Sequence, residues 1–178
     1  MTVSRTICLG FLAVIVIGTL LLMLPASTTG DTWNWNHVLV ALFTSTSAVC
    51  VTGHIVVDTA TYFSPFGHFI IMSLIQVGGL GYMTATTFLL LLLGRRFGLK
   101  DKVALQQALD RTGMNGVAQV LRSIVATTLI FEITGAFLLL LAFSPNHGMQ
   151  LGLWLSIFHS VSAFNNAGFS LFSDNLMG

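Results

Sequence analysis

The sequence predicts an all-α integral membrane protein made of repeated units, one complete and one partial. In each complete unit a membrane span is followed by a re-entrant half-helix, a polar pore loop and a second span. Two observations predict this class. The chain is 54% hydrophobic and only 7% charged, whereas soluble domains carry about 25% charged residues. An eleven-residue motif also occurs twice, at Phe43–Gly53 and Phe158–Gly168, with five identical positions.

Three apolar stretches are long enough to cross a bilayer. Ile7–Leu24 contains 18 uncharged residues, Phe66–Gly94 contains 29, and Ser123–Ser144 is interrupted only by Glu132. A spanning helix needs about 20 mainly apolar residues. A cleaved secretory signal is the alternative for the first stretch, but that stretch is longer than the usual apolar core of about 7–15 residues.

Two further apolar stretches, Trp35–Ser47 and Gln150–Ser162, contain 13 residues each. A helix of that length is about 20 Å long, which suits a segment that enters the bilayer and turns back. Each repeated motif begins inside one of these stretches. The predicted organisation is a first unit at 1–96, a cytoplasmic connector at 97–115 and an incomplete second unit at 116–178.

The charges predict the orientation in the plasma membrane. All seven basic residues precede the first span or lie between the second and third spans: Arg5, Arg95, Arg96, Lys100, Lys102, Arg111 and Arg122. The positive-inside rule makes this side cytoplasmic, together with the N-terminus. Both motifs then enter from the outside in the same sense, as parallel repeats around a channel can do. No basic patch beside aromatic residues indicates nucleic-acid binding, and 100–109 predicts a short amphipathic surface helix.

Each motif ends in a short polar loop. The two loops are Cys50-Val51-Thr52-Gly53 and Asn165-Asn166-Ala167-Gly168. Non-helical backbone is tolerated at membrane depth only against protein or a watery cavity. Rows of backbone carbonyl oxygens can replace the hydration shell of a cation, and the C-terminal end of a helix favours positive charge. The backbone of these eight residues therefore predicts an ion-binding filter. Four serines could hydrogen-bond the loops from behind: Ser45, Ser47, Ser160 and Ser162.

Three segments resemble the Trk/Ktr/HKT superfamily of potassium transporters, most closely its KtrB-like and TrkH-like membrane subunits. They are Thr44–Gly53, Gln76–Gly81 and His159–Ser170. The resemblance covers essentially the whole chain. It implies potassium uptake through a filter to which four span–pore-loop–span units each contribute one strand. It also implies that Gly53 and Gly168 are filter glycines, as in potassium-selective members.

The resemblance further implies a homodimer in membrane lipid and a cytosolic nucleotide-binding regulatory ring. We expect uptake to be passive or coupled to Na⁺ or H⁺. It implies no enzymatic activity and no cofactor beyond the transported K⁺. The histidines lack the close spacing of a transition-metal site. Because only two of the four strands fall within these 178 residues, we expect the chain to be the N-terminal portion of a longer subunit.

Glu132 leaves two interpretations open. A carboxylate in the middle of a span is costly and suggests a function, here proton or sodium coupling. Alternatively, it joins two helices through hydrogen bonds. The glycine cluster of the second span, Gly78, Gly79 and Gly81, favours close helix packing over a gating hinge.

Three residues near the predicted outer mouth, His54, Asp58 and Asp174, could raise the local cation concentration or be ordinary loop residues.

Two other function classes compete with transport. An intramembrane hydrolase would use Ser160 with His159, although successive residues on a helix point about 100 degrees apart. A noncatalytic membrane assembly protein would tolerate replacement of the loop glycines.

Overall fold

The computed structural model describes residues 3–30, 35–92 and 114–173. Its contacts divide the chain into two units, 1–79 with 131–178 and Leu80–Ile130. Across the described ranges the regular structure is helical, and the only β-type pairing is a single bridge between Thr28 and Phe63. The all-α class predicted from the sequence is confirmed.

The first helix, α1, covers Val3–Leu22 and ends two residues before the predicted limit of its span. Leu24 is extended, with φ −63° and ψ 139°, and Pro25 begins the 3₁₀ turn η1, Pro25–Ser27. A residue before proline disfavours helical geometry because the ring crowds it. The hydroxyl of Ser27 donates a 2.7 Å hydrogen bond to the carbonyl of Leu21 and so satisfies one helix end.

A short helix and a long helix follow. Helix α2, Trp35–Val49, is 15 residues long and continues two residues beyond the predicted half-helix. After a non-helical stretch come the single turn α3, Thr59–Tyr62, and the long helix α4, Pro65–Leu92. Apolar segments long enough to cross a membrane lie at Pro65–Thr84 and Leu121–Phe164, and a shorter one lies at Ile7–Leu22, within the part of the chain that is described.

The helix α6, Met114–Phe164, consists of two helices joined at Gly148. Gly148 has φ 75° and ψ 166°, a region that is accessible essentially only to glycine. Pro145, one turn earlier, lacks an amide hydrogen and weakens the end of the first helix. The break lies between the predicted third span and the predicted second half-helix, so the chain reverses at the position the sequence indicated.

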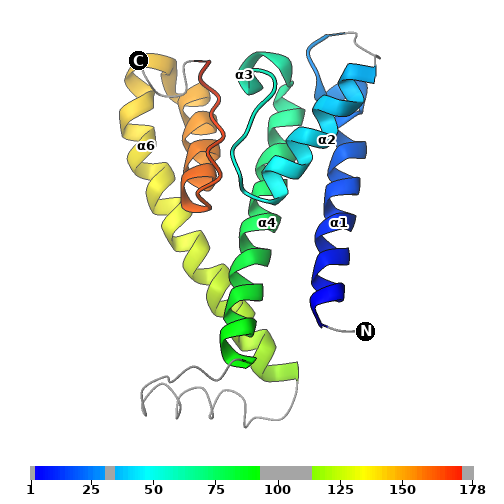
Figure 1. The fold of residues 1–178 in the computed structure, drawn as a ribbon. Coiled ribbons are helices and arrows are strands. Elements are labelled where there is room, and N and C mark those ends of the chain that lie inside the picture. The colour runs from blue at the N-terminus through cyan, green and yellow to red at the C-terminus, as the bar shows by residue number, and fades with distance from the viewer. Residues whose placement is uncertain (1–2, 31–34, 93–113, 174–178) are drawn as a thin grey trace. The chain divides into compact units, whose positions relative to one another are not determined.

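Figure 1 shows that α2 and the 149–164 segment run in the same direction within the first unit. Both start near the upper end in that view, and the non-helical segments after them return toward the same end. A shared core joins these elements, with Ala48 of α2, Ile75 of α4 and Phe158 of α6 each fully buried. The two motif copies therefore belong to one packed unit.

Close packing explains two glycines of the 78–81 cluster, one against backbone and one against a side chain. A Cβ at Gly78 would overlap the carbonyl oxygen of Val49, and a Cβ at Gly79 would overlap the Oδ1 atom of Asn165. The helix α4 thus lies directly against the ends of both short helices. The packing interpretation is confirmed for Gly78 and Gly79.

The second unit, Leu80–Ile130, is described at 80–92 and 114–130, which are the adjoining parts of α4 and α6. Within α4 the Thr84 hydroxyl donates to the Leu80 carbonyl at 2.7 Å. The predicted amphipathic helix at 100–109 and the basic residues of the connector lie outside the described residues. The repeat boundaries at 96 and 115 stay a prediction.

Replacing Gly78 with alanine should destabilise the protein, because the new methyl group collides with rigid backbone at Val49 rather than with a movable side chain. Overpacking of this kind costs about 1–3 kcal/mol. Thermal unfolding of the purified protein, followed by loss of the monodisperse peak, measures the effect. Gly10→Ala is the matched control, since a Cβ at Gly10 meets no atom within 4 Å. Equal stability of the two variants would contradict the packing role.

Candidate functional site

The two short helices end in the same hydrogen-bonded turn. In the first copy, the amides of Cys50, Val51 and Thr52 donate to the carbonyls of Thr46, Ala48 and Ser47 at 2.9, 3.2 and 3.0 Å. In the second copy, the amides of Asn165, Asn166 and Ala167 donate to the carbonyls of Val161, Ala163 and Ser162 at 3.1, 3.0 and 2.7 Å. Crossed bonds of this kind define a Schellman turn. The sequence repeat is therefore also a repeat of backbone structure.

Matching residues of the two loops share left-handed backbone angles. Val51 and Asn166 have φ 57° and 55°, and Gly53 and Gly168 have φ 70° and 73°. Asparagine and glycine tolerate this region, but for a β-branched residue such as Val51 it is an outlier. Strained backbone of this kind tends to occur at functional sites. We interpret the strain at Val51 as a consequence of a loop conformation that fixes the direction of the backbone N–H and C=O groups.

The carbonyl groups of the predicted filter are available to a ligand. None of the eight carbonyl oxygens in 50–53 and 165–168 accepts a hydrogen bond from a described residue. Four of the eight residues, Cys50, Thr52, Asn166 and Gly168, are exposed, so water or a cation can bond to the carbonyl groups of these loops. Both loops also follow the C-terminal end of a helix, where the partial negative charge of the helix dipole favours positive charge.

The two loops meet at their glycines. A Cβ built on Gly53 would lie 2.6 Å from the carbonyl oxygen of Ala167 and 3.1 Å from the Cα atom of Gly168. A Cβ built on Gly168 would lie 3.3 Å from the Cα atom of Gly53. Side chains are therefore excluded at the point where the two backbones come together.

The four motif serines divide into two pairs. Ser47 and Ser162 bond their own loops: Thr52 Oγ1 donates to Ser47 Oγ at 3.1 Å, and Ser162 Oγ donates to the Phe169 carbonyl at 2.7 Å. Ser45 and Ser160 do not bond the loops. Their hydroxyls donate to the carbonyls of Ile15 and Glu132, at 2.9 and 2.7 Å, and so fasten each short helix to the span before it.

The two loops are also linked further out, by Asp58 and Ser173. The Asp58 carboxylate accepts hydrogen bonds from Ser173 Oγ at 2.8 Å, from Thr61 Oγ1 at 2.9 Å and from the Ala60 amide at 3.0 Å. The bond from Ser173 is the main reason that the pKa of Asp58 lies below its ordinary value of 3.8. A lowered carboxyl pKa stabilises the fold above the ordinary value, and this contribution is lost as the pH falls through the lower value in the folded protein.

His54, the second predicted mouth residue, is exposed, and Asp174 lies outside the described residues. Sequence reasoning assigned Asp58 to the mouth but missed its role in joining the loops. The signal was present, because Asp58 precedes Thr59-Ala60-Thr61, and an aspartate at that position caps a helical turn.

Glu132 is buried and bonded to the second loop. Its Oε1 atom lies 3.4 Å from Nδ2 of Asn165, whose amide also lies 3.2 Å from Oε1 of Gln76. The helix-joining interpretation of Glu132 accounts for this geometry. No role for Gln76 was predicted, although an amide inside a 29-residue uncharged apolar stretch indicates a buried polar contact.

His159 and Ser160 do not form a nucleophile and base. The imidazole uses Nδ1 for the Leu155 carbonyl at 2.7 Å, and its Nε2 lies 3.2 Å from Ser170 Oγ and 3.3 Å from the Leu171 amide. Because Nδ1 must donate to a carbonyl, Nε2 is the acceptor, and the ring is the neutral Nδ1–H tautomer. The histidine thus holds the segment that follows the second loop.

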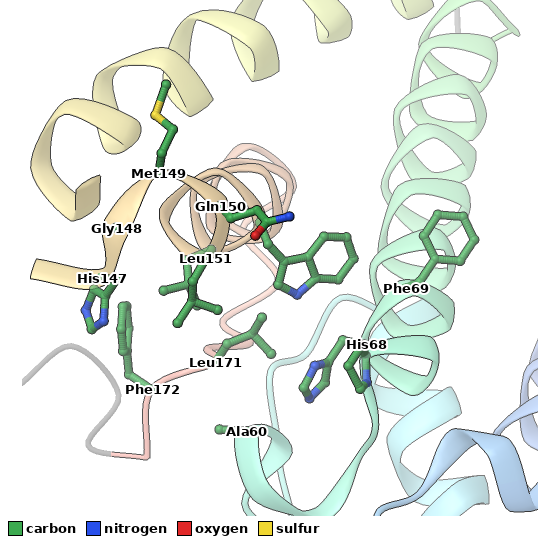
Figure 2. Close-up of a pocket in the computed structure, with 13 residues that line it drawn as sticks. Ala60, His68, Phe69, His147, Gly148, Met149, Gln150, Leu151, Leu171 and Phe172 are labelled. Carbon is green, nitrogen blue, oxygen red and sulfur yellow. The ribbon is translucent and has the colours of Figure 1, made fainter. Parts of the chain in front are cut away.

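An apolar hollow of about 1160 Å³ lies beside the second short helix (Figure 2). His68 borders it on α4, and Met149 and Leu151 border it on α6 (Figure 2). The ring of His147 lies 5.6 Å from that of Phe172, between their centroids. None of the eight predicted filter residues lines this hollow, so its chemistry is separate from that of the loops.

A disulfide should form between cysteines placed at positions 58 and 173, because the present side-chain oxygens are 2.8 Å apart and a disulfide needs Cβ atoms within about 4.5 Å. The variants are Asp58→Cys and Ser173→Cys in a background in which Cys8 and Cys50 are replaced by serine. Oxidation should shift the mobility of the protein on a non-reducing gel. The control pair Asp58→Cys and Ser73→Cys should not cross-link, since Ser73 lies about two turns into α4. Failure of the first pair to oxidise would contradict the contact.

Comparisons with known proteins agree with this arrangement. The family model described as TrkH, cation transport protein, matches residues 3–178. The chain is 44% identical over 176 residues to the Ktr system potassium uptake protein B of Bacillus subtilis, covering 99% of this chain and 39% of that protein. It is 38% identical over 174 residues to the potassium/sodium uptake protein NtpJ of Enterococcus hirae, covering 97% of this chain and 38% of that protein.

A third relative, the Ktr system potassium uptake protein B of Vibrio alginolyticus, is 39% identical over 97% of this chain and 37% of its own length. The chain thus spans less than two fifths of the length of each of these relatives. The match to the family model runs through both motif copies and all described helices. The chain belongs to the TrkH family of cation transport proteins, a family of transporters rather than enzymes.

Proposed function

We propose that the chain forms part of a pathway for potassium uptake across the plasma membrane, with the carbonyl oxygens of Cys50–Gly53 and Asn165–Gly168 as two strands of its selectivity filter. The observation that carries the proposal is the pair of matched loops, which have free carbonyl groups and meet at Gly53 and Gly168. The names of the relatives, which are potassium uptake proteins, support potassium as the ion.

In the proposed mechanism a hydrated cation arrives from outside and exchanges its water for carbonyl oxygens. Rings of backbone carbonyls can replace the hydration shell of K⁺. The ends of α2 and of the 149–164 helix add negative potential from the same side. Because the chain supplies two strands, further strands complete the ring, from later units of the same polypeptide or from a second copy.

The proposed orientation places the segments that follow the loops outside and the start of α1 in the cytoplasm. Arg5 lies in the first turn of α1. Figure 1 shows this end of α1 away from the end of α2, and this agrees with the positive-inside rule. A homodimer and a cytosolic nucleotide-binding regulatory ring complete the proposal. The words "Ktr system" in the names of two relatives are compatible with an assembly of several components.

Two alternatives exist for the driving force of potassium uptake: passive flow, and coupling to Na⁺ or H⁺. The name of one relative includes both potassium and sodium, so sodium is the first coupling ion to test. A role of Glu132 as the coupling group requires its carboxylate to bind or release a cation. The 3.4 Å hydrogen bond from Asn165 gives this carboxylate a structural partner, which favours a helix-joining role over coupling.

Replacing Gly168 with serine should abolish potassium uptake or reduce the preference for K⁺ over Na⁺ by at least about tenfold, the effect of roughly 1.4 kcal/mol in relative binding. The physical reason is that a side chain at this position meets the backbone of Gly53 at 3.3 Å and must adopt φ 73°. The full polypeptide that carries these residues is expressed in cells lacking potassium uptake. Growth at low potassium and initial rates of K⁺ and Na⁺ entry are then measured.

The matched control is Gly30→Ser, because a Cβ at Gly30 has no neighbour within 4 Å. It should leave both rates unchanged. Surface labelling shows whether each variant reaches the membrane. A Gly168→Ser variant that reaches the membrane and keeps wild-type rates and selectivity would exclude the filter and would favour a noncatalytic assembly role.

A further inference from the structure

Asn165 connects the second loop to two long helices. Its side chain is 7% exposed. The Nδ2 atom lies 2.9 Å from the Val161 carbonyl, 3.2 Å from Oε1 of Gln76 on α4, and 3.4 Å from Oε1 of Glu132 on α6. Asn165 is also the first residue of the proposed second filter strand. The side chain of a filter residue is thus fixed from behind while its carbonyl group remains free.

The orientation of this amide follows from its surroundings. Three oxygen acceptors lie on the Nδ2 side, whereas Oδ1 is buried without a hydrogen-bond partner among the described residues. A flipped amide would place Oδ1 against the Val161 carbonyl oxygen, which cannot donate a hydrogen bond. The Oδ1 atom lies against Gly79 instead, where a Cβ would overlap it. The glycine therefore provides the space in which the amide takes its bonded orientation.

Glu132 contacts the second motif through both its main chain and its side chain. Its carbonyl accepts the 2.7 Å bond from Ser160, and its carboxylate accepts a 3.4 Å bond from the side-chain amide of Asn165. The carboxylate is 7% exposed. A buried carboxylate is stable only when hydrogen bonds compensate for lost hydration, and the Asn165 amide supplies one such bond.

The first copy of the motif lacks this arrangement. Ser45 donates to the Ile15 carbonyl as Ser160 donates to the Glu132 carbonyl. In both spans the glycine three residues later faces the serine: a Cβ at Gly18 would lie 2.5 Å from Ser45 Oγ, and one at Gly135 would lie 2.6 Å from Ser160 Oγ. Ile15 is thus the structural counterpart of Glu132. In the first copy an isoleucine occupies this position and the short helix still packs on its span. A carboxylate is therefore not required for this packing.

The loop positions differ in the same way. Cys50 is the counterpart of Asn165 in the repeated motif, and its side chain is exposed. Asparagine and glutamate therefore occur together in the second copy, and cysteine and isoleucine occur together in the first. The paired difference indicates that Glu132 is present to bond Asn165.

We propose that Glu132 is a positioning residue of the ion filter: through Asn165 it fixes the carbonyl row of the second strand, and it does not carry a coupling proton or sodium ion. This inference rests on the proposed potassium uptake function. A row of carbonyl groups that is held in place discriminates between cations of different size and hydration better than one that can relax around the smaller ion. Loss of the contact should therefore lower selectivity before it lowers transport.

Four variants of the full polypeptide test this role: Glu132→Gln, Glu132→Leu, Asn165→Ala and the double variant Glu132→Leu/Asn165→Ala. Initial rates of K⁺ and Na⁺ uptake into intact cells are measured, together with the dependence of K⁺ uptake on external pH and sodium. Glu132→Gln keeps an oxygen acceptor for Asn165, so its K⁺/Na⁺ ratio and its pH and sodium dependence should stay within twofold of wild type.

Glu132→Leu and Asn165→Ala should each lower the K⁺/Na⁺ ratio by about tenfold, as expected for one lost hydrogen bond to a charged group. The double variant should be no worse than either single variant, because both changes remove the same contact. Ser73→Ala is the control. It deletes a hydroxyl whose 2.8 Å bond to the Phe69 carbonyl stays within α4, and it should leave the ratio unchanged.

Two results would overturn the inference. One is a Glu132→Gln variant that loses its pH or sodium dependence while keeping its K⁺/Na⁺ ratio, which would identify a coupling group. The other is an unchanged ratio in Asn165→Ala protein that reaches the membrane. If Glu132→Leu does not reach the membrane, Asn165→Ala still breaks the same bond with the carboxylate in place. A wild-type protein that transports no potassium would instead refute the proposed function.

Discussion

The contact between the Gly53 and Gly168 backbones is the constraint on which the rest of the first unit depends. Two chain segments can approach this closely only if neither carries a side chain at the meeting point. Each segment must then arrive from a helix that stops at the same depth. The Schellman turns at Val51 and Asn166 end both helices in this way and leave the following carbonyl groups unbonded. Backbone acceptors without a partner in the protein need solvent or a ligand, and in the proposed function this ligand is the transported cation.

The side chains that hold the two loops in place differ between the two copies of the motif. On the first side, the end of α2 lies against Gly78, and the loop carries a strained valine at position 51. On the second side, an asparagine bonds to Glu132 and Gln76, and His159 holds the return segment. Two repeated loops in one chain need not be symmetric in their supporting side chains to follow the same backbone path, as the matched φ angles show. The proposed filter depends on that shared path.

The hydrogen bond between Asp58 and Ser173 links the same two loops further out. It joins the two return segments by a hydrogen bond between residues that are also repeat counterparts, 115 positions apart. A surface bond of this kind contributes little to global stability. Its effect is local, because it restricts the distance between the segments that leave the two loops.

The sequence by itself determined the elements and their order. The all-α class, the two short helices and the change of direction between Ser144 and Gln150 follow from the lengths of the apolar stretches and from the distribution of basic residues. The pairing of the motifs also follows, since small residues and glycine at matched positions specify a local backbone path. Helix ends were displaced by about two residues, as at Leu22 and Val49, because the last turn depends on its hydrogen-bond partners.

Only the tertiary structure decided which side chains meet. Three contacts illustrate this. Ser160 bonds to the Glu132 carbonyl, Asn165 bonds to Glu132 and Gln76, and Gly79 leaves space for the Asn165 amide. The residues in these contacts are 28 to 89 positions apart in the sequence. Composition and periodicity state that a polar residue in a span needs a partner, but they do not state which one. The partner is set by how three helices pack, and packing depends on the shape of every side chain between them.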